Sequence, residues 1–428
     1  MIKYLEGNCI DKIKELEDNS IDCVVSSPPY FGLRDYGTAQ WQGGDPNCDH
    51  ETKRSRGDDI KEGDKQGTNK GSRPNSQRVC YCGAKRIDEQ FGLEKSYQDY
   101  IANTVKVFET FKPKLKDTAT IWWNVGDSYS SGNRKTTTLQ TVRKPKSNEI
   151  SESKQKYLDG LIVRPPIQTG IKEKDLLMIP NRVAIALQEA GWYIRSEIIW
   201  HKPNPMPESV RDRPTSCHEK IWLITKNKKY YYDADAIKEP LAASSIPRLN
   251  QNIKNQMGSA RAHAGGKTNG PMKAVSLGSK RNKRNVWTVT TKPFRGAHFA
   301  TFPKDLIEPC IKAGCPEKVC VECGKPQVKE FYRDKSTLPV KRNKRDGDSD
   351  RAVGGVYQKW MEENPPQITI KPSCNCNKGF KSGIVLDPFA GAGTTGLVAK
   401  ENNRAAILIE LNGEYLAMAK KRIETVLI

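Results

Sequence analysis

A glycine-rich stretch between a predicted strand and a predicted helix constrains the fold of this chain more than any other feature. The stretch runs from Asp387 to Gly396 and has the sequence DPFAGAGTTG. An apolar run at 383–386 precedes it, and a helical pattern at 394–402 follows it. Glycines at such a junction let the backbone turn tightly and approach a ligand closely. A strand at 405–411 and a helix at 414–425 complete a unit of parallel strands joined by a crossover helix.

The same stretch predicts a cofactor-binding loop without fixing the cofactor. Gly391, Gly393 and Gly396 satisfy the spacing GxGxxG, which is typical of nicotinamide dinucleotide sites. A phosphate-binding P-loop is excluded, because no lysine follows the glycines. Glu410 ends the next predicted strand, where its carboxylate can accept hydrogen bonds from the two hydroxyls of a ribose. Because rival cofactors use such an acid equally, the loop alone leaves the alternatives open.

Short apolar runs alternate with amphipathic stretches along the rest of the chain, which is typical of an α/β fold. The sequence therefore predicts a Rossmann-like, doubly wound sheet that is mostly parallel. Predicted strands lie at 3–6, 21–26, 118–125, 193–201 and 220–226, and predicted helices lie at 101–111 and 179–190.

Four polar segments interrupt this alternation. They are rich in Gly, Ser, Asn, Lys and Arg. Their presence is consistent with the low hydrophobic content of the whole chain, 36%, and with its mean hydropathy of -0.71. Such segments have too little apolar surface to form cores of their own, so we interpret them as insertions over the sheet. The polar stretches are 43–78, 128–171, 241–284 and 325–371; we expect core segments at 1–42, 91–127, 176–240, 286–314 and 381–428, and insertions at 43–90, 128–175, 241–285 and 315–380.

The charge of the chain favours a polyanionic partner. The formal net charge is +21 and the isoelectric point is near 9.4. Lysine and arginine side chains that neutralise phosphates release counterions, so nucleic acid is the leading expectation, with a merely solvated basic surface as the alternative. Residues 1–20 lack the apolar segment of a signal peptide, and no apolar run approaches membrane-spanning length. We therefore expect a cytoplasmic protein.

A second motif, Ser27-Pro28-Pro29-Tyr30, stands at the end of the predicted strand at 21–26. The two prolines fix the turn and lack N–H groups, which leaves carbonyl oxygens as pure acceptors. An exocyclic amine of a base supplies hydrogens for such acceptors, and Tyr30 offers a ring on which a base extruded from DNA can stack. The alternative for this motif by itself is an ordinary Pro-Pro strand exit.

Together the two motifs give the chain a specific resemblance. It resembles the beta class of DNA amino-methyltransferases, in which a (Ser/Asp/Asn)-Pro-Pro-Tyr motif precedes the target-recognition region and a DPFxGxGTT motif follows near the C-terminus. Three further stretches match that class, at 124–127, 218–220 and 298–303. The resemblance implies S-adenosylmethionine as cofactor and a circularly permuted sheet, in which the two termini lie close together.

The resemblance also assigns residues to the two parts of the site. Asn8 stands where members of the class often carry Asp, which leaves its contact with the cofactor open. The predicted catalytic residues are Ser27, Pro28, Pro29 and Tyr30, and the predicted cofactor-binding residues are Asn8, Phe299, Pro303, Asp387, Pro388, Phe389, Gly391, Gly393, Thr394, Thr395 and Glu410.

Ser27 favours N4 of cytosine as the target, because the resembling cytosine enzymes mostly carry Ser-Pro-Pro-Tyr and the adenine-N6 enzymes mostly carry Asp-Pro-Pro-Tyr. Adenine N6 remains the alternative. Methylation at cytosine C5 would need a Cys nucleophile, and Cys310, which follows Pro309, lies in a predicted amphipathic helix where packing is the expected role. Two other classes stay open: a nicotinamide-dependent oxidoreductase and a catalytically inactive DNA-binding module.

The expected macromolecular partner is double-stranded DNA. Recognition is predicted in the segment 241–284 with help from 128–171, because both combine basic side chains with Asn or Gln and glycine-permitted loops. A solvated loop is the alternative for these segments. A homodimer and a cognate restriction nuclease are further partners to be considered. The basic residues singled out are Lys280, Arg281, Lys283 and Arg284.

Eight potential metal ligands flank the first and last insertions. Each insertion brings four soft ligands, the number that a tetrahedral structural zinc ion needs. The later set is the stronger, because C-x-x-C followed by glycine resembles a zinc knuckle; buried free thiols are the alternative for both. The earlier set is Cys48, His50, Cys80 and Cys82, and the later set is Cys320, Cys323, Cys374 and Cys376.

Overall fold

The computed structural model describes residues 1–33, 36, 38–48, 80, 82–130, 170–242, 280–292, 301–332, 334, 336, 337, 360 and 363–426. Its centre is one eight-stranded sheet in which five of the seven pairings are parallel and β7 runs antiparallel to both neighbours. The predicted α/β class and mostly parallel sheet are therefore confirmed. In spatial order the strands are β1 (Ile2–Glu6), β16 (Ala405–Glu410), β15 (Ile384–Asp387), β2 (Ile21–Ser26), β5 (Leu115–Val125), β7 (His218–Thr225), β6 (Tyr193–His201) and β10 (Val286–Thr288).

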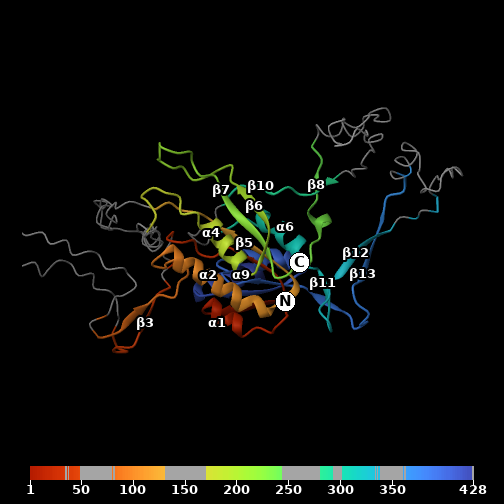
Figure 1. Ribbon diagram of the computed structural model, residues 1–428. Helices are drawn as coiled ribbons and strands as arrows, with labels where there is room; N and C mark the ends of the chain where they lie inside the picture. The colour runs from red at the N-terminus through yellow and green to blue at the C-terminus, as the bar shows by residue number, and fades with distance from the viewer. Residues whose placement is uncertain are drawn as a thin grey trace, which may run out of the picture.

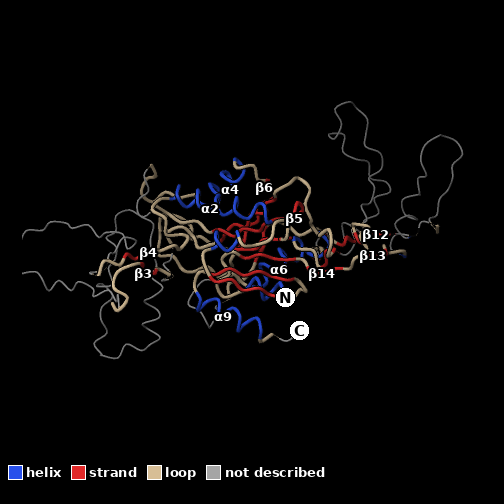
Figure 2. The backbone as a smooth tube through the Cα atoms, turned by 90° about the horizontal axis from the view of Figure 1, so that it is seen from below, coloured by secondary structure: helices blue, strands red, loops and turns tan. Residues whose placement is uncertain are grey.

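Helices cover both faces of this sheet, and Figure 2 shows α2 and α4 on one side of the strands with α9 on the other. The sequence causes this arrangement because side chains alternate across a strand. In β2, Val24 joins the core under the first set of helices, whereas Cys23 and Val25 join the core on the opposite face. The first face carries α1 (Cys9–Lys14), α2 (Tyr97–Phe111) and α4 (Ile179–Glu189), and the second carries α6 (Lys304–Gly314), α8 (Thr394–Glu401) and α9 (Gly413–Glu424).

The two ends of the chain lie close together, as Figure 1 shows. The N-terminal strand β1 pairs in parallel with β16 through Ile2–Ala406 to Glu6–Glu410, and the backbone N–H of Ala406 donates to the Met1 carbonyl at 3.1 Å. The last helix, α9, packs against β1. The permuted strand order that was expected from the order of the motifs is thus confirmed.

The insertions contribute short two-stranded ribbons where they are described. Figure 1 shows β3 at one end of the molecule and β12 with β13 at the other. The ribbons are β3 (Gln40–Gln42) with β4 (Lys85–Ile87), β8 (Glu239–Pro240) with β9 (Lys280–Arg281), β11 (Lys318–Cys320) with β14 (Phe380–Ser382), and β12 (Gln327–Tyr332) with β13 (Gln367–Pro372). Short 3₁₀ turns occupy Lys112–Lys114 and Ala234–Ile237.

Element boundaries differ from the prediction where capping was overlooked. The helix predicted at 101–111 begins earlier, at Tyr97, because the Ser96 hydroxyl accepts a hydrogen bond from the backbone N–H of Asp99 at 3.1 Å. Helix α1 was not predicted; Asn8 caps it by accepting from the backbone N–H of Ile10 at 2.9 Å. Among the described residues, none of the helices has the length and apolar character that crossing a membrane requires.

Candidate active site

Both motifs lie at the point where the winding of the sheet reverses. The chain passes from β15 to β16 in one direction and from β2 to β5 in the other, and β15 and β2 are neighbours. In doubly wound sheets, the crevice beyond the carboxyl ends of two such strands is where ligands bind. Ser27 follows the end of β2, and Asp387 ends β15. The parallel pairing therefore brings the predicted catalytic motif beside the predicted cofactor loop.

Asp387 fixes the cofactor loop to the sheet. Its carboxylate is 1% exposed and accepts hydrogen bonds from the Ser26 hydroxyl at 2.6 Å, the Thr395 hydroxyl at 2.6 Å and the Phe389 backbone N–H at 3.1 Å. Burial raises the pKa of Asp387 to about 6, against the lowering effect of these hydrogen bonds. The carboxylate is fully engaged within the protein, so its role is to shape the loop.

The three glycines of the loop have different structural roles. Gly391 has a φ of +49° and nothing within 4 Å of the position a Cβ would occupy, so this part of the backbone is open to a ligand. Gly393 has a φ of +74°, and a Cβ there would lie 2.7 Å from the Ala419 Cβ of α9. At Gly396 a Cβ would lie 2.6 Å from a Leu408 methyl group. The last two glycines thus allow close packing of α8, and the first allows approach of a ligand.

Glu410 lies beside the open part of the loop. Its carboxylate accepts from the Gly391 N–H at 2.7 Å and from the Asn412 N–H at 3.0 Å, one bond on each oxygen. An ionised carboxylate has about four acceptor positions, so capacity for ligand hydroxyls remains. Phe389 packs against Phe91 with ring centroids 5.2 Å apart, which places an aromatic surface at the loop. This donor and acceptor set fits an adenosyl cofactor.

The catalytic motif is part of a hydrogen-bonded cluster drawn from three strands. The Ser27 hydroxyl donates to the Tyr30 hydroxyl at 3.2 Å, and the Tyr30 hydroxyl donates to a Glu219 carboxylate oxygen at 2.6 Å. The Asn124 amide donates to Tyr30 at 2.7 Å, to Glu219 at 3.1 Å and to Ser27 at 3.3 Å. Lys202 forms an ion pair with Glu219 on the far side of the cluster. Ser27 Oγ donates one hydrogen bond and accepts one in this network, so one acceptor position remains.

The Tyr30 side chain is fixed by close packing and by its hydrogen bond to Glu219. A Cβ on Gly126 would lie 2.5 Å from the Tyr30 ring, so this glycine is needed for the ring to fit. Burial, followed by the negative charge of Glu219, raises the pKa of Tyr30 well above its usual value, so the phenol stays a hydrogen-bond donor. The Pro29 carbonyl accepts from the Tyr100 hydroxyl at 3.2 Å, which leaves the Ser27-Pro28 segment as the source of a carbonyl acceptor for an amine.

One acceptor in the cluster has no partner. Asn124 Oδ1 is buried and forms no hydrogen bond with the described part of the chain. A buried polar atom without a partner costs about 1–3 kcal/mol, so this oxygen is a polar group whose satisfaction the described side chains do not explain.

The remaining predicted residues occupy several places. Asn8 caps α1 and donates from its amide to Glu89 at 3.2 Å. Pro303 caps α6, and its carbonyl accepts from the Leu306 N–H at 3.1 Å. Pro28 and Pro388 are buried at the ends of β2 and β15. Thr394 begins α8, and its hydroxyl accepts from Arg422 at 3.0 Å; Phe299 lies outside the described residues.

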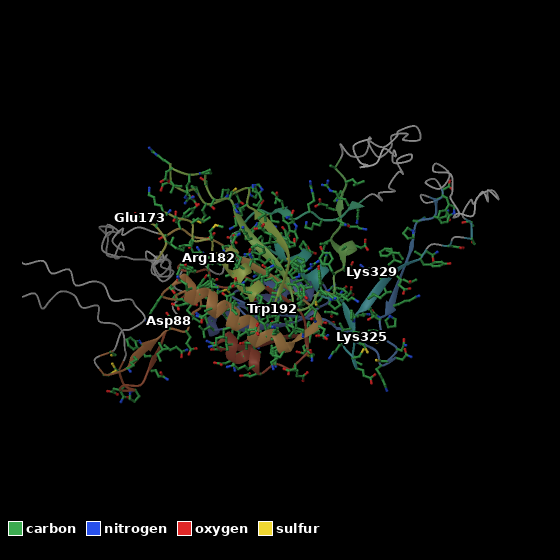
Figure 3. The ribbon with its side chains drawn as sticks, in the orientation of Figure 1. Asp88, Glu173, Arg182, Trp192, Lys325 and Lys329 are labelled. Atoms are coloured by element: carbon green, nitrogen blue, oxygen red, sulfur yellow. The ribbon has the colours of Figure 1, made fainter. Side chains whose placement is uncertain are left out.

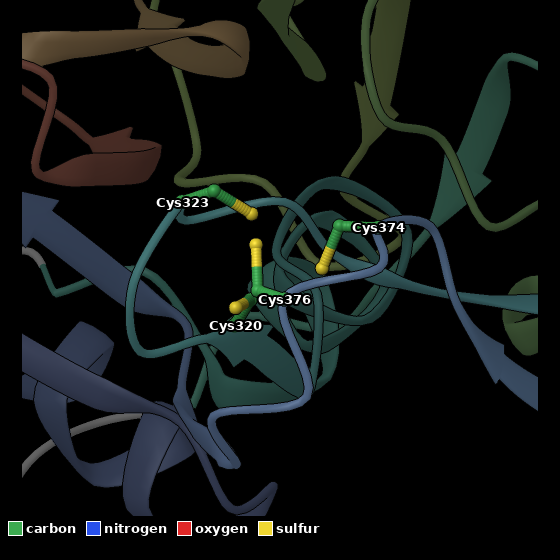
Figure 4. Close-up of side chains that lie close together, drawn as sticks. All are labelled: Cys320, Cys323, Cys374 and Cys376. Atoms are coloured by element: carbon green, nitrogen blue, oxygen red, sulfur yellow. The ribbon is translucent and has the colours of Figure 1, made fainter.

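Seven of the eight candidate metal ligands are described, and they form two groups. The sulfur atoms of Cys320, Cys323, Cys374 and Cys376 lie within 4.8 Å of one another, and Figure 4 shows the four side chains converging. The sulfur atoms of Cys48, Cys80 and Cys82 also lie within 4.8 Å of one another, whereas His50 lies outside the described residues.

The sequence analysis did not single out Glu219 or Lys202, which the structure places beside the predicted catalytic motif. Both stretches that carry the cluster partners were noticed, at 124–127 and 218–220, but only as family matches. A charged pair beside a run of apolar strand residues was the available signal, because buried charges need partners. The side chains of Lys202 and Glu219 are only 19% and 16% exposed, which sets this pair apart from surface ion pairs.

Comparisons with known proteins agree with this site. A family profile described as DNA methylase matches residues 21–321 and 327–421. The type II methyltransferase M.Cfr9I of Citrobacter freundii is 33% identical over 419 residues, which are 98% of this chain and 86% of that protein. M.SmaI of Serratia marcescens, also a type II methyltransferase, is 32% identical over 421 residues, 98% of this chain and 90% of that protein.

A search of solved structures finds a DNA methyltransferase from the PvuII system, described as cytosine-N4-specific. It is 13% identical, with a TM-score of 0.45, and the match covers 98% of this chain and 85% of that one.

Proposed function

Because this chain belongs to the DNA methylase family whose members modify N4 or N6 amino groups, and is a type II DNA methyltransferase of that class, we propose a specific reaction. The protein transfers a methyl group from S-adenosylmethionine to the exocyclic amine of a flipped base in double-stranded DNA, namely N4 of cytosine. One observation carries the proposal. The hydrogen bond of 2.6 Å between Ser26 and Asp387 joins the strand that bears the catalytic motif to the strand that bears the cofactor loop.

The cofactor loop supports S-adenosylmethionine. The open backbone at Gly391 would lie along the cofactor, and the Glu410 carboxylate would accept hydrogen bonds from its ribose hydroxyls. The bound cofactor supplies a methyl group on a positively charged sulfonium, so the reaction needs only an aligned nucleophile. Nicotinamide chemistry, the alternative suggested by GxGxxG alone, has no support from the family to which the chain belongs.

The chain's own residues prepare the amine. Its lone pair is delocalised into the base ring, and hydrogen bonds from its N–H groups to acceptors favour a pyramidal nitrogen whose lone pair is free to attack. Ser27 Oγ and a carbonyl of the Ser27-Pro28 segment are the acceptors proposed for these bonds. Because positive charge develops on the nitrogen during transfer, these bonds strengthen in the transition state.

Cytosine is proposed over adenine because the motif begins with Ser27, the residue that predominates in resembling cytosine-N4 enzymes. The same acceptors serve an adenine N6 amine, so this remains the second candidate. A C5 mechanism is not favoured. Cys310 is 1% exposed inside α6, where its thiol donates to the Leu306 carbonyl, and burial raises its pKa well above the usual value.

DNA binding is proposed for the segments 128–171 and 241–284, most of which lies outside the described residues. The described basic cluster lies at the β10 edge of the sheet. There Arg281 and Arg284 each place a guanidinium nitrogen 3.0 Å from one Glu239 oxygen, whereas Lys283 lies 5.0 Å from the centre of the Trp287 ring. Lys280 is exposed. The lysines are therefore better available for phosphates than the two paired arginines.

The decisive experiment identifies the methylated atom. Unmethylated bacterial genomic DNA is incubated with the protein and methyl-labelled S-adenosylmethionine, digested to nucleosides and analysed by mass spectrometry. We expect labelled N4-methylcytosine, and far less label with Ser27→Ala. Labelled N6-methyladenine would refute the cytosine assignment while leaving the mechanism in place. Label at cytosine C5 would refute the mechanism itself, because that reaction requires a thiolate nucleophile.

A further inference from the structure

Four cysteine side chains from two distant segments meet at the base of the last insertion. Cys320 ends β11, Cys323 lies in the turn that follows, and Cys374 and Cys376 lie between β13 and β14. Their sulfur atoms lie within 4.8 Å of one another, yet no disulfide joins them (Figure 4). Cys320, Cys374 and Cys376 lie inside the two segments that match the methylase profile, and Cys323 lies in the short gap between them.

The turn that joins Cys320 to Cys323 is closed by backbone hydrogen bonds. The Gly324 N–H donates to the Cys320 carbonyl at 3.0 Å, the Cys320 N–H donates to the Lys325 carbonyl at 2.9 Å, and Gly324 has a φ of +68°. The turn therefore holds a C-x-x-C pair close together, which is a usual spacing of zinc ligands.

The two described strands of the ribbon beyond the cluster bury little surface. Every residue of β13 is exposed, and so is every residue of β12 except Gln327. Phe331 is 51% exposed and Ile370 is 63% exposed. A two-stranded ribbon is marginally stable by itself, so hydrophobic burial does not explain the convergence of four cysteines. Figure 3 shows Lys325 and Lys329 on this part of the chain.

We propose that Cys320, Cys323, Cys374 and Cys376 bind one structural zinc ion, which closes the base of the β12–β13 ribbon. Four thiolates in tetrahedral arrangement are a preferred ligand set of zinc and leave no position open for substrate. The free energy of metal binding then contributes to the folding of the insertion.

The position of the cluster separates it from methyl transfer. The Gly324 carbonyl accepts from the Lys116 ammonium at 3.4 Å, and Lys116 forms an ion pair with Asp22 at 2.7 Å. Asp22 also accepts from the Ile384 N–H at 2.9 Å, at the beginning of β15. Asp22 and Ile384 stand at the amino ends of β2 and β15, whereas Ser27 follows the carboxyl end of β2. The zinc ion anchors the insertion at the edge opposite the active site.

The test is the metal content of the full-length protein. Purified wild type, Cys323→Ser/Cys376→Ser and Cys376→His are analysed by inductively coupled plasma mass spectrometry, with Cys217→Ser as the matched control outside both clusters. We expect the double variant to lose about one zinc ion per chain, and Cys376→His, which supplies another zinc ligand, to retain it. The difference between proteins is the measure, so zinc held by the Cys48 group does not affect it. Equal zinc in wild type and double variant, or iron in place of zinc, would overturn the proposal.

Two further measurements follow the metal itself. A mercurial thiol reagent is titrated into wild type and the double variant while released zinc is followed with a chromogenic chelator; about one more zinc ion released per chain from wild type supports the site, and equal release overturns it. Wild type reconstituted with Co²⁺ should show the visible bands of tetrahedral cobalt thiolate, and these bands should shift in Cys376→His, where a nitrogen replaces one sulfur ligand; unshifted bands overturn the proposal. Protease should cut between β11 and β14 faster after zinc removal, while S-adenosylhomocysteine binding persists.

Discussion

Glu219→Gln tests whether the hydrogen-bonded cluster behind Ser27 positions the catalytic motif. The substitution preserves the shape of the side chain and removes its negative charge. Glu219 accepts from Tyr30 at 2.6 Å and from Asn124 at 3.1 Å, and it pairs with Lys202. The variant therefore weakens the bond that holds Tyr30 and leaves the Lys202 ammonium without its counter-ion in a largely buried place.

The size of the expected fall in kcat follows from the hydrogen bonds that the Glu219→Gln variant weakens. A hydrogen bond to a charged group contributes about 1.5–3 kcal/mol, and the lower half of this range applies because Lys202 and Glu219 keep 19% and 16% exposure to solvent. If that energy holds Ser27 and Tyr30 in the geometry that methyl transfer requires, its loss lowers kcat about 10- to 50-fold. The KM for S-adenosylmethionine should not change, because Glu219 lies on β7 and does not contact the cofactor loop.

The assay is single-turnover methyl transfer at saturating cofactor, with Tm and S-adenosylhomocysteine affinity measured on the same preparations. Glu308→Gln is the matched control, because Glu308 pairs with Lys312 at 2.7 Å on the exposed surface of α6. This control should change kcat by less than about twofold. If Glu219→Gln lowers Tm but leaves kcat within about twofold of wild type, Glu219 is a structural ion pair and the positioning role is refuted.

Two further predictions concern ionisation and charge. The folded-state pKa of Asp387 is raised from 3.8 to about 6, so its contribution to stability is fully present below about pH 4 and is lost as the pH rises through about 6. Relative to Asp387→Asn, the free energy of unfolding of wild type should fall by about 3 kcal/mol over this window, and parallel urea-denaturation curves would contradict the assignment. For DNA, Lys280→Gln/Lys283→Gln should reduce the slope of log affinity against log salt by up to about 2, and Arg281→Gln/Arg284→Gln should change it less. Equal slopes in all proteins would place the phosphate contacts elsewhere.

The sequence was sufficient to place the two motifs because each is a local feature. Gly391 and Gly393 mark a junction of strand and helix, and two prolines mark the exit of β2. In the structure β15 pairs in parallel with β2, and this pairing brings Asp387 beside Ser26. Local chemistry and regular topology thus carried the prediction of the cofactor loop and of the catalytic turn.

The cluster behind Ser27 could not be derived in the same way. Glu219 reaches Tyr30 only because β7 enters the sheet antiparallel, between β5 and β6. Periodicity predicts that β7 is a strand but gives neither its direction nor its register, and a shift by one residue would turn Glu219 to the other face. The contact therefore depends on long-range pairing that no short motif encodes.

The hydrogen bonds of the Asp387 carboxylate explain the relative position of the catalytic turn and the cofactor loop better than strand pairing does. β15 and β2 share only two paired positions, Val385 with Cys23 and Leu386 with Val24, so the ladder ends before the site begins. Beyond it, one oxygen of Asp387 holds Ser26 and the other holds Thr395 in the first turn of α8. The same group therefore sets both the start of the catalytic turn and the path of the cofactor loop. A misplacement of the reacting groups by about 1 Å costs on the order of 100-fold in rate. The buried Asp387 carboxylate, whose pKa is raised by its burial, therefore stabilises the alignment of catalytic turn and cofactor loop on which the proposed methyl transfer depends.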